Sequence, residues 1–323
     1  GNLRKYEKYH SQVFQGFSIL NCNKNIIVLY INVVDKRRMK IMFIEIIKFI
    51  VYSGLIVLIS KYILVTTLRK LAEALNLKPK TVGDVSGYAT SVPELLTITT
   101  SSLRGLTGAS VYNILSSNVI NLIQYLGAIL LNKNISKLRN KAILTDLILV
   151  FFTIIIPIIF LKFNIELKLA VVPLFIILYI LFRFLNNHVH KLYLKSEDAE
   201  LEEEIEGEKL EQKKNSKNVI IYVLVLIITG ILLFVVGELL GDTLENLCNL
   251  FGVSEVIVGI LLGFVTSLPE LITFFEAQRH YKKINDDMLG VVEATNNLLT
   301  SNILNLFAIQ TIGIILIWIK SIV

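Results

Sequence analysis

The residues of this chain best suited to chemistry are two glutamates, Glu94 and Glu270, each directly after a proline. They are the only acidic residues in the middles of their two long, largely apolar segments. Inside a membrane helix a carboxylate costs ~2.5–3.5 kcal/mol or more, so an acid at such a position is expected to be functional. A converging pair of carboxylates suits a hard cation that prefers oxygen ligands, such as Ca²⁺.

The two glutamates belong to an internal repeat. Residues 87–97 and 263–273 are identical at seven of eleven positions, and the second copy follows the first at a spacing of 176 residues. A second pair of blocks follows in the same order, because residues 113–122 and 297–306 are identical at six of ten positions at a spacing of 184. Two blocks that recur in the same order indicate a duplicated structural unit.

Each copy supplies further oxygen atoms around its glutamate. Pro93 and Pro269 have no amide hydrogen, so each is expected to free a backbone carbonyl one turn earlier. Ser, Thr and Asn inside membrane helices also commonly do no more than bond neighbouring helices. The set contains no Cys or His, which disfavours soft transition metals. The other candidate ligands and supporting residues are Gly87, Thr90, Ser91, Asn113, Ser117 and Asn121 in the first copy and Gly263, Thr266, Ser267, Asn297, Ser301 and Asn305 in the second.

The composition places these residues in a membrane. Of the 323 residues, 54% are apolar and only 18% are charged, against ~25% charged residues in soluble domains. Residues 105–132, 219–237 and 294–319 contain no Asp, Glu, Lys or Arg, and each run can cross a bilayer as a helix. These features exclude a soluble enzyme and predict an all-α polytopic membrane protein rather than a β-barrel. The net charge of +6 is expected to orient helices rather than to bind nucleic acid.

Eight membrane spans are expected, and their order makes the repeat an inverted one. The first copy begins in the second span and the second copy in the seventh, so the copies cross the membrane in opposite directions. Inverted repeats are typical of secondary transporters, whose sites lie at the repeat interface near the midplane. Residues 68–79 and 242–252 are expected to form short amphipathic helices, and the last span is long enough to bend or break. The expected spans are roughly 41–67, 80–103, 106–131, 142–162, 167–186, 218–240, 254–277 and 286–319.

A hydrophilic loop separates the two halves of the chain. Residues 197–211 hold nine acidic residues and one basic residue, which is typical of a solvated linker. A regulatory calcium site is the alternative interpretation, but no Asp-x-Asp-x-Asn-Gly pattern occurs there. The expected parts are an N-terminal extension at 1–38, a first half at 39–189 with its motif at 87–122, the acidic loop at 190–217, and a second half at 218–323 with its motif at 263–306.

Basic residues concentrate in the loops of one membrane face, among them those at 133–141 and 279–283. The positive-inside rule predicts that these loops and the acidic loop are cytoplasmic. We expect the protein in the plasma membrane of a prokaryotic cell. Asp146, Glu238 and Glu293 lie near the ends of spans and are expected to be interfacial.

With both repeats in view, the chain resembles the sodium/calcium exchanger (cation/calcium antiporter) superfamily over about residues 41–319. That family has two inverted α-repeats, each with a Gly-Thr-Ser-x-Pro-Glu core and a downstream Gly-Asn-x-x-Gly-Ser-Asn-x-x-Asn/Asp core. The resemblance implies exchange by alternating access, with the first and sixth helices sliding against the rest. It also implies that Glu94 and Glu270 bind Ca²⁺ and share Na⁺, that Thr90 and Thr266 lend carbonyls, that Ser91, Ser117, Ser267 and Ser301 line Na⁺ sites, and that Asn121 and Asn305 complete a four-cornered centre.

The chain departs from the family pattern in three ways. Many relatives have Asp at the position of Asn305, so one titratable corner of the site is missing here. Glycines of the family beside the Asn/Ser core are replaced by Tyr112, Ser116, Asn296 and Thr300. The family usually has ten helices, so a chain with about eight is expected to be a shortened member or an incomplete reading frame.

Three functions remain open at this point. The first is a secondary antiporter that exchanges Ca²⁺ for Na⁺. The second is Ca²⁺/H⁺ exchange through the same site, because carboxylates bind protons as well as sodium. The third is a shortened family member that does not transport. None of these is an enzyme or needs a cofactor, and the expected partners are the lipid bilayer and inorganic cations.

Overall fold

The computed structural model describes residues 24–75, 77–163, 165, 167–193, 216–283 and 286–322. Part of the expected N-terminal extension, residues 1–23, and most of the expected acidic loop, residues 194–215, lie outside these ranges. The chain divides into two units, Gly1–Ile47 and Lys48–Val323. In the first unit the described residues form the start of a helix at Lys24, and the architecture that follows is that of the second unit.

Every regular element in the described ranges is helical, and the chain is an all-α polytopic membrane protein. Seven helical stretches in these ranges are long and apolar enough to cross a membrane. The elements are α2 (Lys24–Ile59), η1 (Ser60–Val65), α3 (Thr66–Ala74), α4 (Pro79–Thr90), α5 (Val92–Leu103), α6 (Thr107–Leu131), η2 (Ile135–Arg139), α7 (Lys141–Lys162), η3 (Leu169–Val171), α8 (Val172–Tyr193), α10 (Ser216–Phe251), α11 (Glu255–Thr266), α12 (Leu268–Lys282), α13 (Asp287–Ile303), η4 (Leu304–Ile309) and α14 (Gln310–Ile322).

The expected span at 80–103 is formed by two helices, α4 and α5, of 12 residues each. Neither is long enough alone for a bilayer, which requires about 20 helical residues. The expected interruption of the last span is a π-helical segment, η4. The expected short amphipathic helix at 68–79 corresponds in part to α3, which directly follows η1 and ends at Ala74. The expectation of a separate helix at 242–252 was wrong, because α10 runs unbroken to Phe251.

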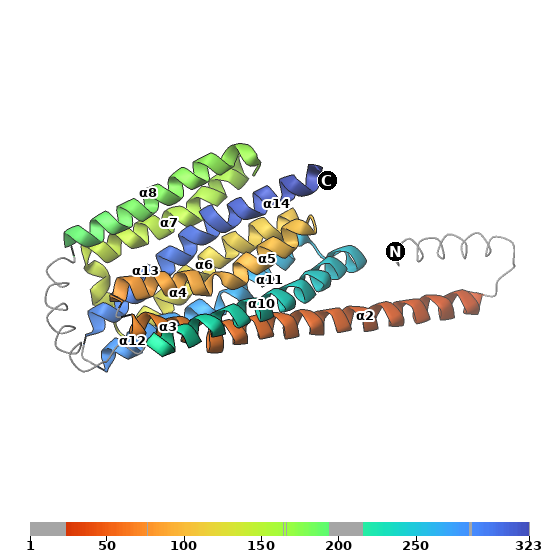
Figure 1. Ribbon diagram of the computed structural model, residues 1–323. Helices are drawn as coiled ribbons and strands as arrows, with labels where there is room; N and C mark the ends of the chain where they lie inside the picture. Colours follow the sequence, from red (N-terminus) through yellow and green to blue (C-terminus); the bar gives the residue numbers. More distant parts are fainter. Residues whose placement is uncertain are drawn as a thin grey trace. The chain divides into compact units, whose positions relative to one another are not determined.

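The two halves of the repeat pack across each other. In the first half α4 lies against α13 of the second half, and α11 of the second half lies against α6 of the first (Figure 1). Glycines make the close approach possible. A Cβ at Gly87 would lie 2.9 Å from the Asn297 carbonyl oxygen, and one at Gly263 would lie 2.8 Å from the Asn113 carbonyl oxygen. Small residues at helix crossings are typical of membrane proteins.

Two further helices, α7 and α8, lie side by side (Figure 1) and cover one face of the second repeat. Phe175 and Phe182 of α8 pack edge-on against Phe307 of η4, with ring centroids 5.7 and 5.2 Å apart. On the other side α10 packs against α3 and α5. The central helices α4–α6 and α11–α13 are therefore held between apolar outer helices, and this arrangement buries their polar residues.

Candidate functional site

Both copies of the repeat contain a break between two helices. Ser91 separates α4 from α5, and Ser267 separates α11 from α12. Their backbone angles are nearly the same, with φ −82° and ψ −1° at Ser91 and φ −82° and ψ −2° at Ser267. A proline stands in the first turn after each break, where its missing amide hydrogen costs the new helix nothing.

The breaks place both glutamates in the first turn of a helix. Glu94 is the third residue of α5 and Glu270 the third residue of α12, and both side chains are completely buried. The amino-terminal end of a helix carries partial positive charge, which stabilises a carboxylate there. Each carboxylate also accepts a hydrogen bond from a serine in its own half, Ser117 Oγ to Glu94 Oε1 at 2.8 Å and Ser301 Oγ to Glu270 Oε1 at 3.1 Å.

The same serines join the two repeats. The hydroxyl oxygens of Ser91 and Ser301 lie 2.9 Å apart, and those of Ser267 and Ser117 lie 3.0 Å apart. Each helix break therefore contacts the long helix of the opposite repeat. Any movement of α4 or α11 against its partner helix changes these contacts directly.

Hydrogen bonds hold the side-chain amides of Asn113 and Asn297, the first asparagine of each second block, in one orientation. Asn113 Nδ2 donates to Thr97 Oγ1 at 2.7 Å, and Asn297 Nδ2 donates to Thr273 Oγ1 at 2.5 Å. These two threonines in turn donate to the backbone carbonyls of the two glutamates. With their NH₂ groups held in this way, the asparagines have only their carbonyl oxygens left for a ligand.

A second set of amides lies where α6 and α13 cross. Asn118 and Asn302 donate to each other's backbone carbonyl, both at 3.2 Å. Asn121 Nδ2 donates to Asn302 Oδ1 at 3.1 Å, and Asn305 Nδ2 donates to Asn118 Oδ1 at 3.2 Å. The pattern is the same in both directions, so the contacts have the two-fold pseudo-symmetry expected of an inverted repeat.

Several oxygens at this centre have no hydrogen-bond partner among the described residues. All are acceptors, and an unpaired buried acceptor costs about 1–3 kcal/mol. A cation would satisfy them, because carboxylate and amide oxygens are its natural ligands. Within the described ranges no three His, Cys, Asp or Glu side chains form a metal-binding group, so the ligands here would be two carboxylates and neutral oxygens. The unpaired atoms are Glu94 Oε2, Glu270 Oε2, Asn113 Oδ1, Asn121 Oδ1 and Asn305 Oδ1.

The residues proposed from the sequence thus lie together, and we refer to them as the candidate ion site. Thr90 and Thr266 end α4 and α11 next to the breaks. The Thr90 hydroxyl lies 3.5 Å from Asn297 Oδ1, and the Thr266 hydroxyl lies 3.5 Å from Ser117 Oγ. Their roles as ligands remain predictions. Sequence reasoning did not single out Thr97, Thr273, Asn118 and Asn302, although each pair is identical in the two copies.

Two acidic residues expected to be interfacial are buried between helices. Asp146 is completely buried, with its Oδ2 2.6 Å from His190 Nε2 and its Oδ1 2.9 Å from Asn186 Nδ2. Glu293 is buried in α13 and accepts a hydrogen bond from Arg69. The partners come from distant parts of the chain, so position in a span did not reveal them. Glu238, by contrast, is about half-exposed and lies 3.7 Å from Arg104.

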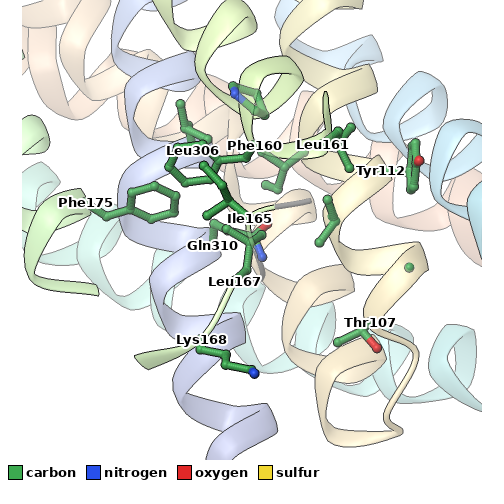
Figure 2. A pocket seen from close by; sticks show the side chains of 14 residues that line it. Thr107, Tyr112, Phe160, Leu161, Ile165, Leu167, Lys168, Phe175, Leu306 and Gln310 are labelled. Carbon is green, nitrogen blue, oxygen red and sulfur yellow. The ribbon is translucent and has the colours of Figure 1, made fainter. Parts of the chain in front are cut away.

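A cavity of about 470 Å³ lies between α6, the connection from α7 to α8, and α14. Its walls are mainly apolar, with Phe160, Ile165 and Leu306 among the residues in Figure 2 and with Lys168 and Gln310 as polar members. None of the candidate ligands lines it. It therefore does not coincide with the candidate ion site.

One comparison, with models of protein families, places the chain in a family. The family model described as sodium/calcium exchanger protein matches residues 46–186 and 221–322, well over half of the chain. No curated protein gives a significant match. Among solved structures, the chain is similar to the sodium–calcium exchanger NCX_Mj soaked with 100 mM Na⁺ and 10 mM Sr²⁺, with 23% identity, 85% of this chain and 83% of that chain covered, and a TM-score of 0.49. The same values hold for NCX_Mj soaked with 10 mM Na⁺ and zero Ca²⁺. By the match to the family model, the chain belongs to the sodium/calcium exchanger family, a family of transporters.

Proposed function

We propose that the chain exchanges Ca²⁺ for Na⁺ across the membrane by alternating access at the candidate ion site. The observation that carries this proposal is the set of unpaired acceptor oxygens around Glu94 and Glu270. Glu94 and Glu270 stand at equivalent positions of the repeat, as do Asn121 and Asn305, and both carboxylates belong to helices that begin beside a break.

Calcium fits the charge and the chemistry of the site. Two carboxylates supply the negative charge that must replace part of the hydration shell of Ca²⁺, and amide oxygens add neutral ligands. Glu94 and Glu270 would bind the ion directly, and Asn121 and Asn305 would complete the centre. In this proposal Ca²⁺ is cargo, and the site must also be able to release it.

Sodium would occupy oxygens of the same region. The carbonyl ends of α4 and α11 stop at Thr90 and Thr266, and broken helices in transporters coordinate Na⁺ with such carbonyls. Ser91, Ser117, Ser267 and Ser301 would add hydroxyl oxygens. Sodium bound there would compete with Ca²⁺ for the carboxylates, which provides the coupling an antiporter needs.

Proton exchange is the second candidate, and the buried carboxylates are the observation that favours it. Burial makes the charged form of Glu94 and Glu270 costly, so each could take up a proton when calcium leaves. The neutral Asn305 removes one further group that could carry a proton. We therefore rank sodium first.

For orientation, we propose that the loops at 133–141 and 279–283 face the cytoplasm of a prokaryotic cell, as the positive-inside rule suggests. A cysteine placed at Lys137 or Lys282 should then be protected from an impermeant thiol reagent in intact cells. Labelling of these positions from outside would reverse the orientation.

The function is tested by calcium-45 flux into proteoliposomes. A Na⁺ gradient should drive Ca²⁺ uptake at constant pH, and a H⁺ gradient without Na⁺ should not. Uptake driven only by the H⁺ gradient would establish the second candidate. Uptake driven by neither gradient, with monodisperse protein, would contradict both and support a non-transporting member.

A further inference from the structure

One face of α4 carries three polar residues that reach across to α8. Successive residues on each helix are four positions apart, and residues at this spacing lie on the same helix face. From one contact to the next, the residue numbers rise along α4 and fall along α8, so the two helices run antiparallel here. We call them the α4–α8 ladder. Its rungs are Lys80 Nζ to Asn187 Oδ1 at 2.9 Å, Arg183 Nη1 to Asp84 Oδ1 at 2.9 Å, and the hydroxyls of Tyr88 and Tyr179 at 3.0 Å.

The middle rung also ties α4 to α13. Asp84 Oδ1 accepts hydrogen bonds from Thr300 Oγ1 at 2.6 Å and from Asn296 Nδ2 at 2.9 Å. The side chains of Asp84 and Arg183 are only 13% and 19% exposed, so this charged pair is shielded from solvent. Hydrogen bonds to a carboxylate are among the strongest in proteins. Asp84 therefore joins three helices at one point.

This point lies directly beside the candidate ion site. Thr300 and Asn296 precede Ser301 and Asn297 in α13, and both of these belong to the site. Close helix packing accompanies the polar contacts, because a Cβ at Gly83 would lie 2.5 Å from the Glu293 carbonyl oxygen. Moving α4 away from α13 at this end would break the bonds of Asp84 and the packing together.

The other half of the repeat has no equivalent of these residues. The positions of Lys80, Asp84 and Tyr88, carried over at the repeat spacing of 176, fall on Val256, Ile260 and Phe264. Ile260 is 45% and Phe264 is 54% exposed. At the other repeat spacing, Thr300 corresponds to Ser116, whose hydroxyl lies 2.7 Å from the Tyr112 carbonyl of its own helix and 3.4 Å from the Gly259 carbonyl of α11, both uncharged acceptors. The α11 side thus has the same glycine packing without the charged contact.

We propose that the α4–α8 ladder, with Asp84 at its centre, closes the candidate ion site at the end of α4 that begins at Pro79, and that it releases when the site opens there. This inference rests on the proposed alternating access. The closed state of this end is favoured by bonds that the α11 side lacks, so Asp84, Arg183 and Thr300 act as positioning residues and are not ion ligands.

The test is cysteine accessibility in a background with Cys22 and Cys248 replaced by Ala. Ser86 is buried and lies one turn before Thr90 on the same face of α4. The labelling rate of Ser86→Cys therefore measures how easily a reagent reaches the site from this end of α4. The reagent is a charged thiol reagent applied to the full chain in nanodiscs. Asp84→Asn should raise the labelling rate at least about fivefold, the lower end of typical coupling between two states.

Thr300 provides a matched pair that leaves both charges in place. Thr300→Val removes the hydroxyl donor and should also raise the labelling rate, whereas Thr300→Ser keeps the donor and should not. If Asp84→Asn fails to fold, the labelling rates of Thr300→Val and Thr300→Ser test the proposal in its place. Equal labelling rates in the parent, Asp84→Asn and Thr300→Val, all monodisperse, would overturn the proposal even if calcium flux of the parent is intact. Absence of that flux would instead contradict the proposed function, because labelling does not require transport.

Discussion

The two copies of the repeat present the same candidate ligands, but different contacts hold their helices in place. Around the glutamates, the serine, threonine and asparagine contacts of one half recur in the other with distances that differ by only a few tenths of an ångström. The glycine packing of the two helix crossings is also alike, but the outer faces of α4 and α11 differ. The outer face of α4 is tied to α8 by charged and polar side chains, whereas Ile260 and Phe264 on α11 are exposed.

The difference indicates which part of the molecule each property depends on. Under the proposed alternating access, the same oxygens would serve the site from both membrane faces, which fits their position at the interface of the two repeats. The relative stability of the two open states does not depend on symmetry, and residues in only one half of the repeat can determine it. Matched substitutions in the two halves can therefore separate binding from the control of opening.

The largest effect is expected at the glutamates. Glu94→Gln and Glu270→Gln should each reduce calcium-45 transport to the background of empty liposomes, because one remaining carboxylate leaves too little charge to replace the hydration of Ca²⁺. The two losses should be equal if the halves contribute equally. Parent-like flux in either variant would show that its carboxylate does not bind the transported ion.

Next come the serines that donate to these carboxylates. A hydrogen bond to a charged group is worth about 1.5–3 kcal/mol, so Ser117→Ala and Ser301→Ala should each lower the apparent calcium affinity roughly tenfold or more. The measurement is uptake against Ca²⁺ concentration. Ser110→Ala serves as a control, because Ser110 is buried in α6 and lies near Ser102 rather than a carboxylate. A loss of calcium affinity in only one of Ser117→Ala and Ser301→Ala would show that the two halves do not contribute equally to the site.

The glycines of the two helix crossings should affect stability in both halves. Gly87→Ala and Gly263→Ala force a Cβ against backbone atoms of the opposite repeat, and overpacking of this kind costs about 1–3 kcal/mol. Thermal unfolding in detergent measures the change. Gly127→Ala and Gly230→Ala are controls, because a Cβ there meets nothing within 4 Å. A stability loss in the controls equal to that in the test pair would refute the packing argument.

A smaller and more specific effect is expected at Asn305. Asn305→Asp adds a third carboxylate to the centre, and like charges in a buried site favour uptake of a proton or an extra sodium. Calcium flux should become more dependent on pH, and the reversal potential should shift because the number of coupled ions changes. Identical pH profiles and reversal potentials in both proteins would mean that position 305 does not line the path of the transported ions.

The sequence predicted the all-α membrane fold and the residues that gather at the centre, because both depend on local patterns. Apolar runs specify membrane helices, and a duplicated motif marks its own important positions. The α4–α8 ladder could not be predicted in this way. Arg183, Asn187 and Tyr179 lie in α8, outside both copies of the motif, and only the packing of α8 brings them to α4.

The partners of residues near the span ends could not be predicted for a related reason. Asp146 was expected to be interfacial because of its position in its span, and only the fold shows that His190 and Asn186 from α8 contact it. The expectation of a separate helix at 242–252 failed because α10 continues unbroken to Phe251. In this part of α10, Asp242 and Glu245 lie 2.5 and 2.7 Å from Arg104.

The most direct test of the account is equilibrium binding of calcium-45 to the purified full chain. The symmetric centre predicts one Ca²⁺ per chain, displaced by Na⁺ but not by choline at the same ionic strength. Binding should be lost in Glu94→Gln and in Glu270→Gln while both variants stay monodisperse. Stoichiometric, sodium-sensitive binding that persists in both glutamate variants would contradict the claim that the two mirrored carboxylates form the ion site.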